Sequence, residues 1–201
     1  MPRLEFWYDL ASNYSYLAAM RVEPMAARAG IDVVWRPFLL GPIFKAQGWN
    51  SSPFNLYPVK GRNMVRDMQR MCADRGLPFV LPDPFPANSL TAVRIAFLGE
   101  AEGWTARFSR AAFAVEFGEG ANIADRATLD NVIARLGLDA VAIIARAQED
   151  SVKDGLRQRT AEAQERGIFG APSFITDTGE LFWGDDRLEQ AIAWARDART
   201  Q

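Results

Sequence analysis

An apolar segment near the N-terminus runs directly into a polar helix start, and this junction limits the folds that the chain can adopt. Residues 4–9 have the composition of a short buried strand, and residues 14–29 have the pattern of a helix that ends at Gly30. Pro24 inside that helix predicts a kink or an early break. Residues 31–38 follow as a second strand. A strand, a helix and a strand in this order form a right-handed crossover, so we expect the two strands to be parallel neighbours.

The rest of the chain predicts a helical block followed by a hairpin and a last helix. Apolar residues recur at helical spacing through the middle of the chain, and a long polar helix near residues 149–165 is expected to return the chain to the sheet. Residues 173–176 and 180–183 flank the turn-forming sequence Asp177-Thr178-Gly179, which is typical of a hairpin. The last helix is expected over residues 186–198.

This order of elements is that of an α/β fold, a thioredoxin-like domain with an all-helical insertion in its middle. We expect residues 1–40 and 166–201 to form the discontinuous thioredoxin-like domain and residues 41–165 to form the helical insertion domain. A chain of 201 residues with 49% hydrophobic residues is long and apolar enough to bury a core of this kind.

The charge balance and the apolar runs restrict the partners. The chain has 23 basic and 25 acidic residues and a formal charge of −2, so it lacks the basic surface that a nucleic acid would require. No run approaches the roughly 20 apolar residues of a membrane span, and the N-terminus does not have the regions of a signal peptide. We therefore expect a cytoplasmic protein that binds neither nucleic acid nor membrane.

Two residue types are scarce in a way that restricts the chemistry. Cys72 is the only cysteine, which excludes a CxxC redox pair, and its place on an apolar helix stripe predicts a buried, inert thiol. The chain has no histidine, which removes Ser-His and Cys-His nucleophile pairs, most zinc sites and the usual general base; no metal is expected. A cofactor whose thiol ionises at a helix N-terminus would meet the need for a base, and glutathione is such a molecule.

Several short segments form a series along nearly the whole chain. They are Asp9-x-x-Ser12-x-Tyr14-Ser15-Tyr16-Leu17, Leu39-Leu40-Gly41 followed by Lys45, Lys60-Gly61-x-x-Met64-x-x-Asp67-x-x-Arg70, Gly170-Ala171-Pro172-Ser173-Phe174, and Phe182-Trp183-Gly184-Asp185-Asp186-Arg187-Leu188. In this order the series resembles the 2-hydroxychromene-2-carboxylate isomerases and the related kappa-class glutathione transferases, which are DsbA-like members of the thioredoxin superfamily. Asn13 stands where many members have proline, and Ala171 stands where valine is usual. Neither departure removes a polar group that the chemistry needs.

Ser12 is the expected catalytic residue. Its local sequence alone favours a simple helix cap, because a serine side chain accepts hydrogen bonds from the first N–H groups of a helix. The resemblance implies a second role, since members of the family place the glutathione sulfur against the corresponding serine. The hydroxyl would then donate to the thiolate and stabilise it.

The resemblance also implies the other glutathione contacts. Ala171-Pro172 is expected to be a cis peptide, and the backbone of Ala171 is expected to pair with the cysteinyl backbone of glutathione. Gly184, Asp185 and Asp186 are expected at the γ-glutamyl end, where the carboxylates accept hydrogen bonds from its ammonium group. One of the two aspartates is also expected to cap the last helix.

At the substrate end, the resemblance implies roles for Lys45, Asn55 and Asn88. Lys45 would bind a pyruvyl carboxylate, and the two asparagines would orient hydroxyl or keto oxygens. By composition alone these are ordinary solvated loop residues. Asn50 fits the family pattern as well as Asn55 does, under a slightly different gap.

Two further groups are interpreted from pattern alone. Aromatic residues near these loops are ordinary core residues or, where they line a cleft, contacts for a flat aromatic substrate; they include Phe44, Trp49, Phe54 and Phe85. Charged residues of the next helix are interpreted as a solvated face with ion pairs; they are Lys60, Arg62, Arg66, Asp67 and Arg70.

The resemblance implies a glutathione-dependent isomerase of aromatic catabolism. It would interconvert 2-hydroxychromene-2-carboxylate and trans-o-hydroxybenzylidenepyruvate by reversible thiolate addition, with a small aromatic carboxylate as substrate. A homodimer is expected. Two alternatives stay open: a kappa-like glutathione transferase or peroxidase that uses the same site, and a non-catalytic thioredoxin-like protein that binds glutathione.

Overall fold

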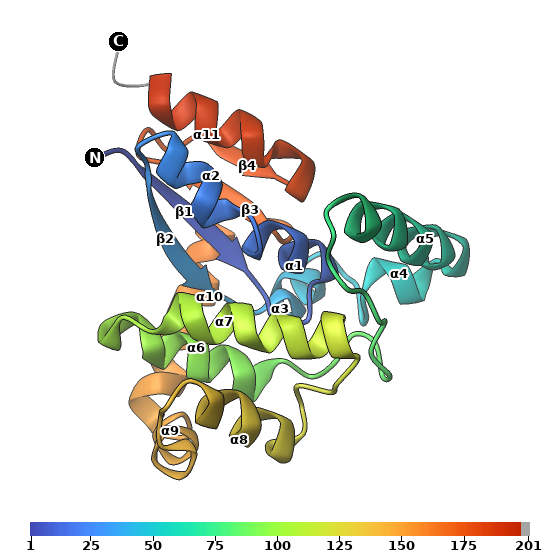
Figure 1. Ribbon diagram of the computed structural model, residues 1–201, viewed down its shortest axis with the longest axis vertical. Helices are drawn as coiled ribbons and strands as arrows, with labels where there is room; N and C mark the ends of the chain where they lie inside the picture. The colour runs from blue at the N-terminus through green and yellow to red at the C-terminus, as the bar shows by residue number, and fades with distance from the viewer. Residues whose placement is uncertain (198–201) are drawn as a thin grey trace.

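A mixed four-stranded sheet organises the protein, whose computed structural model describes residues 1–197 (Figure 1). The strand order is β2-β1-β3-β4. β1 (Arg3–Tyr8) and β2 (Asp32–Pro37) are parallel, β3 (Ser173–Thr176) is antiparallel to β1, and β4 (Leu181–Trp183) is antiparallel to β3. The parallel pair and the hairpin that the sequence predicts are both confirmed.

The crossover between β1 and β2 contains two short helices. α1 (Asn13–Ala19) and α2 (Val22–Arg28) are separated by Met20 and Arg21. Pro24 lies in the first turn of α2, where a backbone N–H has no partner within the helix and its loss costs little. The early break predicted from Pro24 is therefore confirmed.

The regular elements between β2 and β3 are helices, as expected. Its helices are α3 (Leu40–Ala46), α4 (Pro53–Leu56), α5 (Pro58–Asp74), α6 (Leu90–Glu102), α7 (Thr105–Phe113), α8 (Arg126–Arg135), α9 (Ala140–Arg146) and α10 (Asp150–Glu165). A π-helical segment, η1 (Ala114–Gly118), continues α7, and the apolar spacing did not predict it. The whole is a thioredoxin-like α/β fold with a helical insertion; the division at residues 40/41 and 165/166 stays a prediction.

The C-terminal helix begins with a 3₁₀ turn. The turn η2 (Asp185–Arg187) leads directly into α11 (Leu188–Asp197), which packs against β1, β3 and β4. The helix expected over residues 186–198 is thus confirmed as far as Asp197, and Ala198 lies outside the described residues. No helix within residues 1–197 is long and apolar enough to span a membrane.

The sheet is buried on both faces because alternate residues of β1 enter two apolar clusters. Phe6 and Tyr8 belong to the larger cluster, together with residues of α1, α2, α7 and α11. Trp7, between them, belongs to the smaller cluster with Ala163 of α10. This alternation follows from the two-residue repeat of a strand. It fixes the C-terminal end of β1 firmly at the place where α1 begins (Figure 1).

Candidate active site

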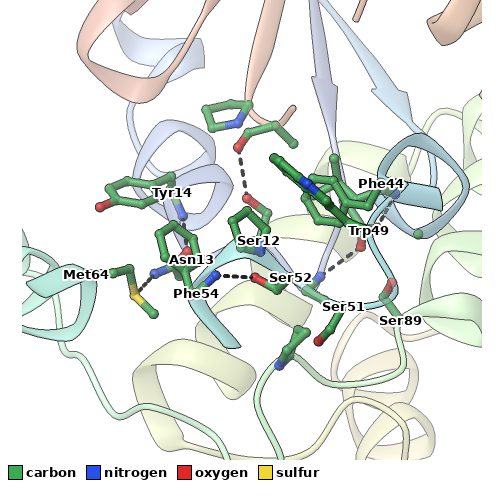
Figure 2. Close-up of a pocket in the computed structure, with 18 of the residues that line it drawn as sticks. Ser12, Asn13, Tyr14, Phe44, Trp49, Ser51, Ser52, Phe54, Met64 and Ser89 are labelled. Atoms are coloured by element: carbon green, nitrogen blue, oxygen red, sulfur yellow. Dashed lines mark hydrogen bonds between the residues drawn. The ribbon is translucent and has the colours of Figure 1, made fainter. Parts of the chain in front are cut away.

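A cleft of about 1580 Å³ lies where the β1–α1 junction meets α3, α4 and α5 of the helical insertion. The segment before α6, the loop before β3 and the turn η2 also contribute to its walls. Figure 2 shows Ser12, Asn13 and Tyr14 at the start of α1, with Phe44, Trp49 and Phe54 from the insertion around them. The charged lining residues are Asp9, Lys45, Lys60, Asp67, Asp185, Asp186 and Arg187.

Ser12 caps α1 and lines the cleft. Its Oγ accepts a hydrogen bond from the backbone N–H of Ser15 at 3.2 Å, which confirms the cap. Its hydroxyl donates to the carbonyl oxygen of Ala171, also at 3.2 Å (Figure 2). Ser12 is only 7% exposed. The hydroxyl is therefore held in one place by two backbone groups that come from opposite ends of the sequence.

The loop before β3 places Ala171 and Pro172 against Ser12. The Ala171–Pro172 peptide bond is cis, as expected. The carbonyl of Pro172 accepts a hydrogen bond from the backbone N–H of Gly184 at 2.9 Å, which joins this loop to the start of η2. Ser12, Ala171, Pro172 and Gly184 consequently line one continuous part of the cleft.

Two buried carboxyl groups lie near this junction. Asp9 accepts hydrogen bonds from the backbone N–H of Ala11 at 3.0 Å and of Leu40 at 2.8 Å, so it ties the start of α1 to the start of α3. Burial raises the pKa of Asp9, and these hydrogen bonds oppose the increase. Glu116 of η1 is fully buried, and neither of its carboxylate oxygens has a hydrogen-bond partner among residues 1–197. Burial, aided by the charge of Asp9, raises the pKa of Glu116 well above its usual value.

Glu116 is expected to make the protein less stable as the pH rises. Its pKa is raised in the folded state, so above the unfolded-state value of about 4.3 the folded protein retains a proton that the unfolded chain releases. The free energy of unfolding should therefore decrease as the pH rises from the unfolded-state pKa to the folded-state pKa of Glu116. Above the folded-state pKa this loss is complete. The Glu116→Gln variant lacks this titration. The difference in free energy of unfolding between the variant and the wild type should therefore change in favour of the variant by up to about 1.4 kcal/mol per pH unit in that range.

Urea denaturation of both proteins between acidic and mildly alkaline pH measures this difference. Glu119→Gln provides a matched control, because the Glu119 side chain is exposed and ion-paired with Arg135. Curves for the wild type and Glu116→Gln that stay parallel across the pH range would show that Glu116 does not titrate with a raised pKa.

The two aspartates expected at the γ-glutamyl end have different surroundings. Asp185 is 3% exposed, and its carboxylate forms ion pairs with Arg21 at 3.1 Å and with Arg75 at 2.7 Å. Asp186 has a side chain that is 74% exposed and is paired only loosely, with Arg187 at 3.3 Å. Both residues line the cleft. Asp186 therefore has accessible oxygens for a ligand, whereas two arginines already compensate the charge of Asp185.

The residues expected at the substrate end are only partly brought together. Lys45, at the end of α3, lines the cleft and is exposed. Asn88 also lines it, and its Oδ1 accepts a hydrogen bond from the backbone N–H of Leu90. The Asn55 amide donates instead to Ser51 and to the carbonyl of Phe85, and Asn55 is not among the lining residues. Asn50, the other asparagine that fits the family pattern, does line the cleft.

The aromatic residues near these loops form part of the cleft wall. The rings of Phe44 and Trp49 lie with their centroids 5.6 Å apart, and those of Tyr14 and Phe54 lie 6.1 Å apart. Phe85 lines the cleft as well. This wall suits a flat, apolar ring system.

The α5 face of the cleft includes charged residues whose sequence pattern predicts a solvated helix face. Lys60 and Asp67 line the cleft, and Asp67 accepts a hydrogen bond from the Tyr14 hydroxyl at 3.2 Å. Met64, between them, accepts a hydrogen bond from the Asn13 amide (Figure 2). These three residues of α5 are separated by four and three positions and so share one helix face. That spacing is the signal that could have identified them.

The residues present fit a peptide thiol. Ser12 has a hydroxyl that can turn toward a sulfur, and the neighbouring carbonyl of Ala171 can accept a hydrogen bond from a peptide N–H. The cleft volume exceeds the roughly 300–1,000 Å³ of a typical small-molecule site, so a cofactor and a substrate can be held together.

Comparisons with known proteins show the family to which this fold belongs. The model of the DSBA-like thioredoxin domain family matches residues 3–192. Two relatives named 2-hydroxychromene-2-carboxylate isomerase are similar to the chain. That of Sphingobium xenophagum is 29% identical over 92% of this chain and 94% of its own length, and that of Pseudomonas putida is 30% identical over 92% and 90%. A solved structure of a 2-hydroxychromene-2-carboxylate isomerase matches with a TM-score of 0.87 and 26% identity, covering 98% of each chain.

Proposed function

The chain belongs to the DSBA-like thioredoxin domain family and is a relative of its 2-hydroxychromene-2-carboxylate isomerases, and on this premise we propose that it is a glutathione-dependent isomerase. The proposed reaction interconverts 2-hydroxychromene-2-carboxylate and trans-o-hydroxybenzylidenepyruvate. The homodimer and the cytoplasmic location that the sequence suggests stay predictions.

One observation carries the proposal, namely that the cleft presents a serine where a redox protein would need a cysteine. Ser12 lines the cleft beside the Ala171–Pro172 loop, while the only cysteine, Cys72, is buried in α5. Burial raises the pKa of Cys72 to about 11, which makes its thiol a poor nucleophile. Cys72 is not among the residues lining the cleft, so the chain supplies no thiol there and a reactive thiol has to come from a bound molecule.

Bound glutathione would supply a thiolate that adds reversibly to the conjugated alkene of the substrate, so that the double bond becomes a rotatable single bond. The Ser12 hydroxyl would donate a hydrogen bond to the sulfur and so favour the ionised form of the thiol. The Ala171 carbonyl would accept a hydrogen bond from the cysteinyl N–H. Asp186, which has accessible oxygens, would accept the γ-glutamyl ammonium, while Asp185 would fix the turn that carries it.

The substrate would lie between the aromatic wall and the positively charged end of α3. Lys45 would bind its carboxylate and stabilise the negative charge that develops on the neighbouring oxygen. Asn88 would orient a hydroxyl or keto oxygen. Of the two asparagines that fit the family pattern, Asn50 is placed in the cleft wall and is the better candidate than Asn55 for the second such contact.

Product analysis tests this function. Purified protein would be incubated with 2-hydroxychromene-2-carboxylate and less glutathione than substrate, and both would be followed by chromatography. An isomerase converts the substrate beyond one equivalent of glutathione and consumes none. Accumulation of a conjugate or of oxidised glutathione would instead indicate the kappa-like transferase or peroxidase. Absence of turnover with retained glutathione binding would indicate the non-catalytic alternative.

Lys45→Ala is expected to lower kcat/KM for a carboxylated substrate by about tenfold, because an exposed lysine contributes a partly screened charge to carboxylate binding. The affinity for glutathione should change by less than about twofold, since Lys45 is proposed at the other end of the cleft from Asp186. Calorimetry with glutathione and initial rates with a carboxylated and an esterified substrate measure the two effects.

Lys153→Ala is a suitable control, because Lys153 of α10 is paired with Asp150 and is not among the residues lining this cleft. If Lys45→Ala abolished glutathione binding and lowered kcat/KM equally for the carboxylated and the esterified substrate, Lys45 would belong to the cofactor end. The proposed division of the cleft would then be wrong.

A further inference from the structure

We propose that the carbonyl of Ala171 controls the hydroxyl proton of Ser12, so that the site activates thiols that carry a neighbouring peptide N–H and discriminates against thiols that lack one. This inference rests on the proposed function, because it concerns the thiol proposed beside Ser12. It adds a reason why a tripeptide thiol, rather than any small thiol, is the cofactor.

The hydrogen bonds of Ser12 leave its proton engaged. A serine hydroxyl has one proton to donate and lone pairs that accept. In the structure the proton is directed to the Ala171 carbonyl at 3.2 Å, and the Oγ accepts from the Ser15 N–H at 3.2 Å. The contact with Ser15 anchors the oxygen as the helix cap. The proton can still rotate about the Cβ–Oγ bond, so it can change acceptor without any movement of the oxygen.

A thiolate therefore competes with the Ala171 carbonyl for the same proton. If the proton turns to the sulfur, Ser12 gains a charge-assisted hydrogen bond. The carbonyl of Ala171, which is partly buried in the cleft wall, then loses the hydrogen bond from Ser12. The free energy of the bond that breaks offsets part of the free energy gained from the new bond. For a simple thiol, part of the benefit of the new bond is consequently cancelled.

A thiol with a peptide N–H removes this cost. Ala171 lies next to Ser12 in the cleft wall, and its carbonyl can accept the N–H of an extended peptide placed alongside it, as in strand addition. The incoming N–H replaces the Ser12 hydroxyl on the carbonyl, and the hydroxyl becomes free to donate to the sulfur. Backbone recognition and thiolate stabilisation are thus coupled through one shared acceptor.

A two-by-two comparison tests the coupling. The two ligands are glutathione and its depsipeptide analogue, in which an ester oxygen replaces the cysteinyl N–H. The two proteins are the wild type and Ser12→Ala, with Ser12→Gly as a second variant because glycine is an acceptable N-cap residue. The apparent pKa of the bound thiol is measured at saturating ligand from the ultraviolet absorbance of the thiolate. The charged lining residues are the same for both ligands, so their effects cancel in the comparison.

We expect the change from amide to ester to raise the bound thiol pKa by about one unit or more in the wild type. In Ser12→Ala and Ser12→Gly the same change should alter the pKa by less than about 0.3 units, because no hydroxyl proton remains to be released. An equal change in the wild type and both variants, or no change in any of them, would overturn the inference.

The failure of this inference differs from the failure of the proposed function. If glutathione binds, turns over substrate and shows a Ser12-dependent thiol pKa that the ester does not alter, the Ala171 carbonyl accepts both donors at once and only the coupling is wrong. If glutathione does not bind at all, the proposed function is wrong and the inference is overturned with it.

Discussion

Ser12→Ala is expected to lower glutathione-dependent turnover by about ten- to a hundredfold while the fold is retained. The activity estimate follows from the loss of one hydrogen bond to a charged sulfur, a contact worth about 1.5–3 kcal/mol. The fold should lose only about 1 kcal/mol, because the variant removes a single cap contact to the Ser15 N–H. The apparent pKa of bound glutathione should rise by about one to two units.

Ser52→Ala is a matched control for this variant. Ser52 also caps a helix, since its Oγ accepts from the Phe54 N–H at 3.3 Å, and it also lines the cleft. Its removal should cost similar stability and leave the thiol pKa unchanged. An unchanged thiol pKa in Ser12→Ala would mean that Ser12 only caps α1.

Asp185→Asn is expected to destabilise the protein by about 3 kcal/mol, the cost of removing one partner from a buried ion pair. The Asp185 side chain is 2% exposed, and its partners Arg21 and Arg75 are 18% and 24% exposed. Arg75 ends α5 and Arg21 follows α1, so the carboxylate joins the helical insertion to the start of α11. Removing its charge takes away the carboxylate that pairs with Arg75, while Arg21 keeps its ion pair with Glu189.

The free energy of unfolding in guanidinium measures this effect, and Asp186→Asn provides the control. Asp186 has the same side chain one position later but is exposed, so its replacement should change stability by less than about 0.5 kcal/mol. The order should be reversed for glutathione affinity, measured on the folded fraction of each variant. Asp186→Asn should then weaken glutathione binding more than Asp185→Asn does. Equal stability losses in the two variants would show that the Arg21–Asp185–Arg75 contacts contribute little.

Local patterns predicted the elements that depend on neighbouring residues. Hydrophobic periodicity predicted the strand pair, and turn chemistry predicted the hairpin around Asp177-Thr178-Gly179. Single residues within reach of their own helices predicted the break near Pro24 and the cap at Ser12. The burial of Cys72 followed in the same way from the apolar stripe of α5.

Contacts between distant segments could not be predicted in this way. The pairing of Asp185 with Arg75 joins positions 110 residues apart, and nothing in either local sequence indicates it. Glu116 is an acidic residue of a type that is mostly exposed, yet it is fully buried in the π-helical segment η1, which the local sequence does not indicate. Lys60 and Asp67 have the composition of a solvated face, and they line the cleft because α5 packs against α1, a contact between segments distant in the sequence.

A crystal structure of the protein with bound glutathione would locate the sulfur relative to Ser12. We predict that the glutathione sulfur lies within hydrogen-bond distance of Ser12 Oγ and that the cysteinyl N–H donates to the carbonyl of Ala171. The γ-glutamyl end should point toward Gly184 and Asp186, leaving the region around Lys45 free for substrate. A structure in which the sulfur lies away from Ser12, or in which glutathione occupies the Lys45 end of the cleft, would contradict the proposed site.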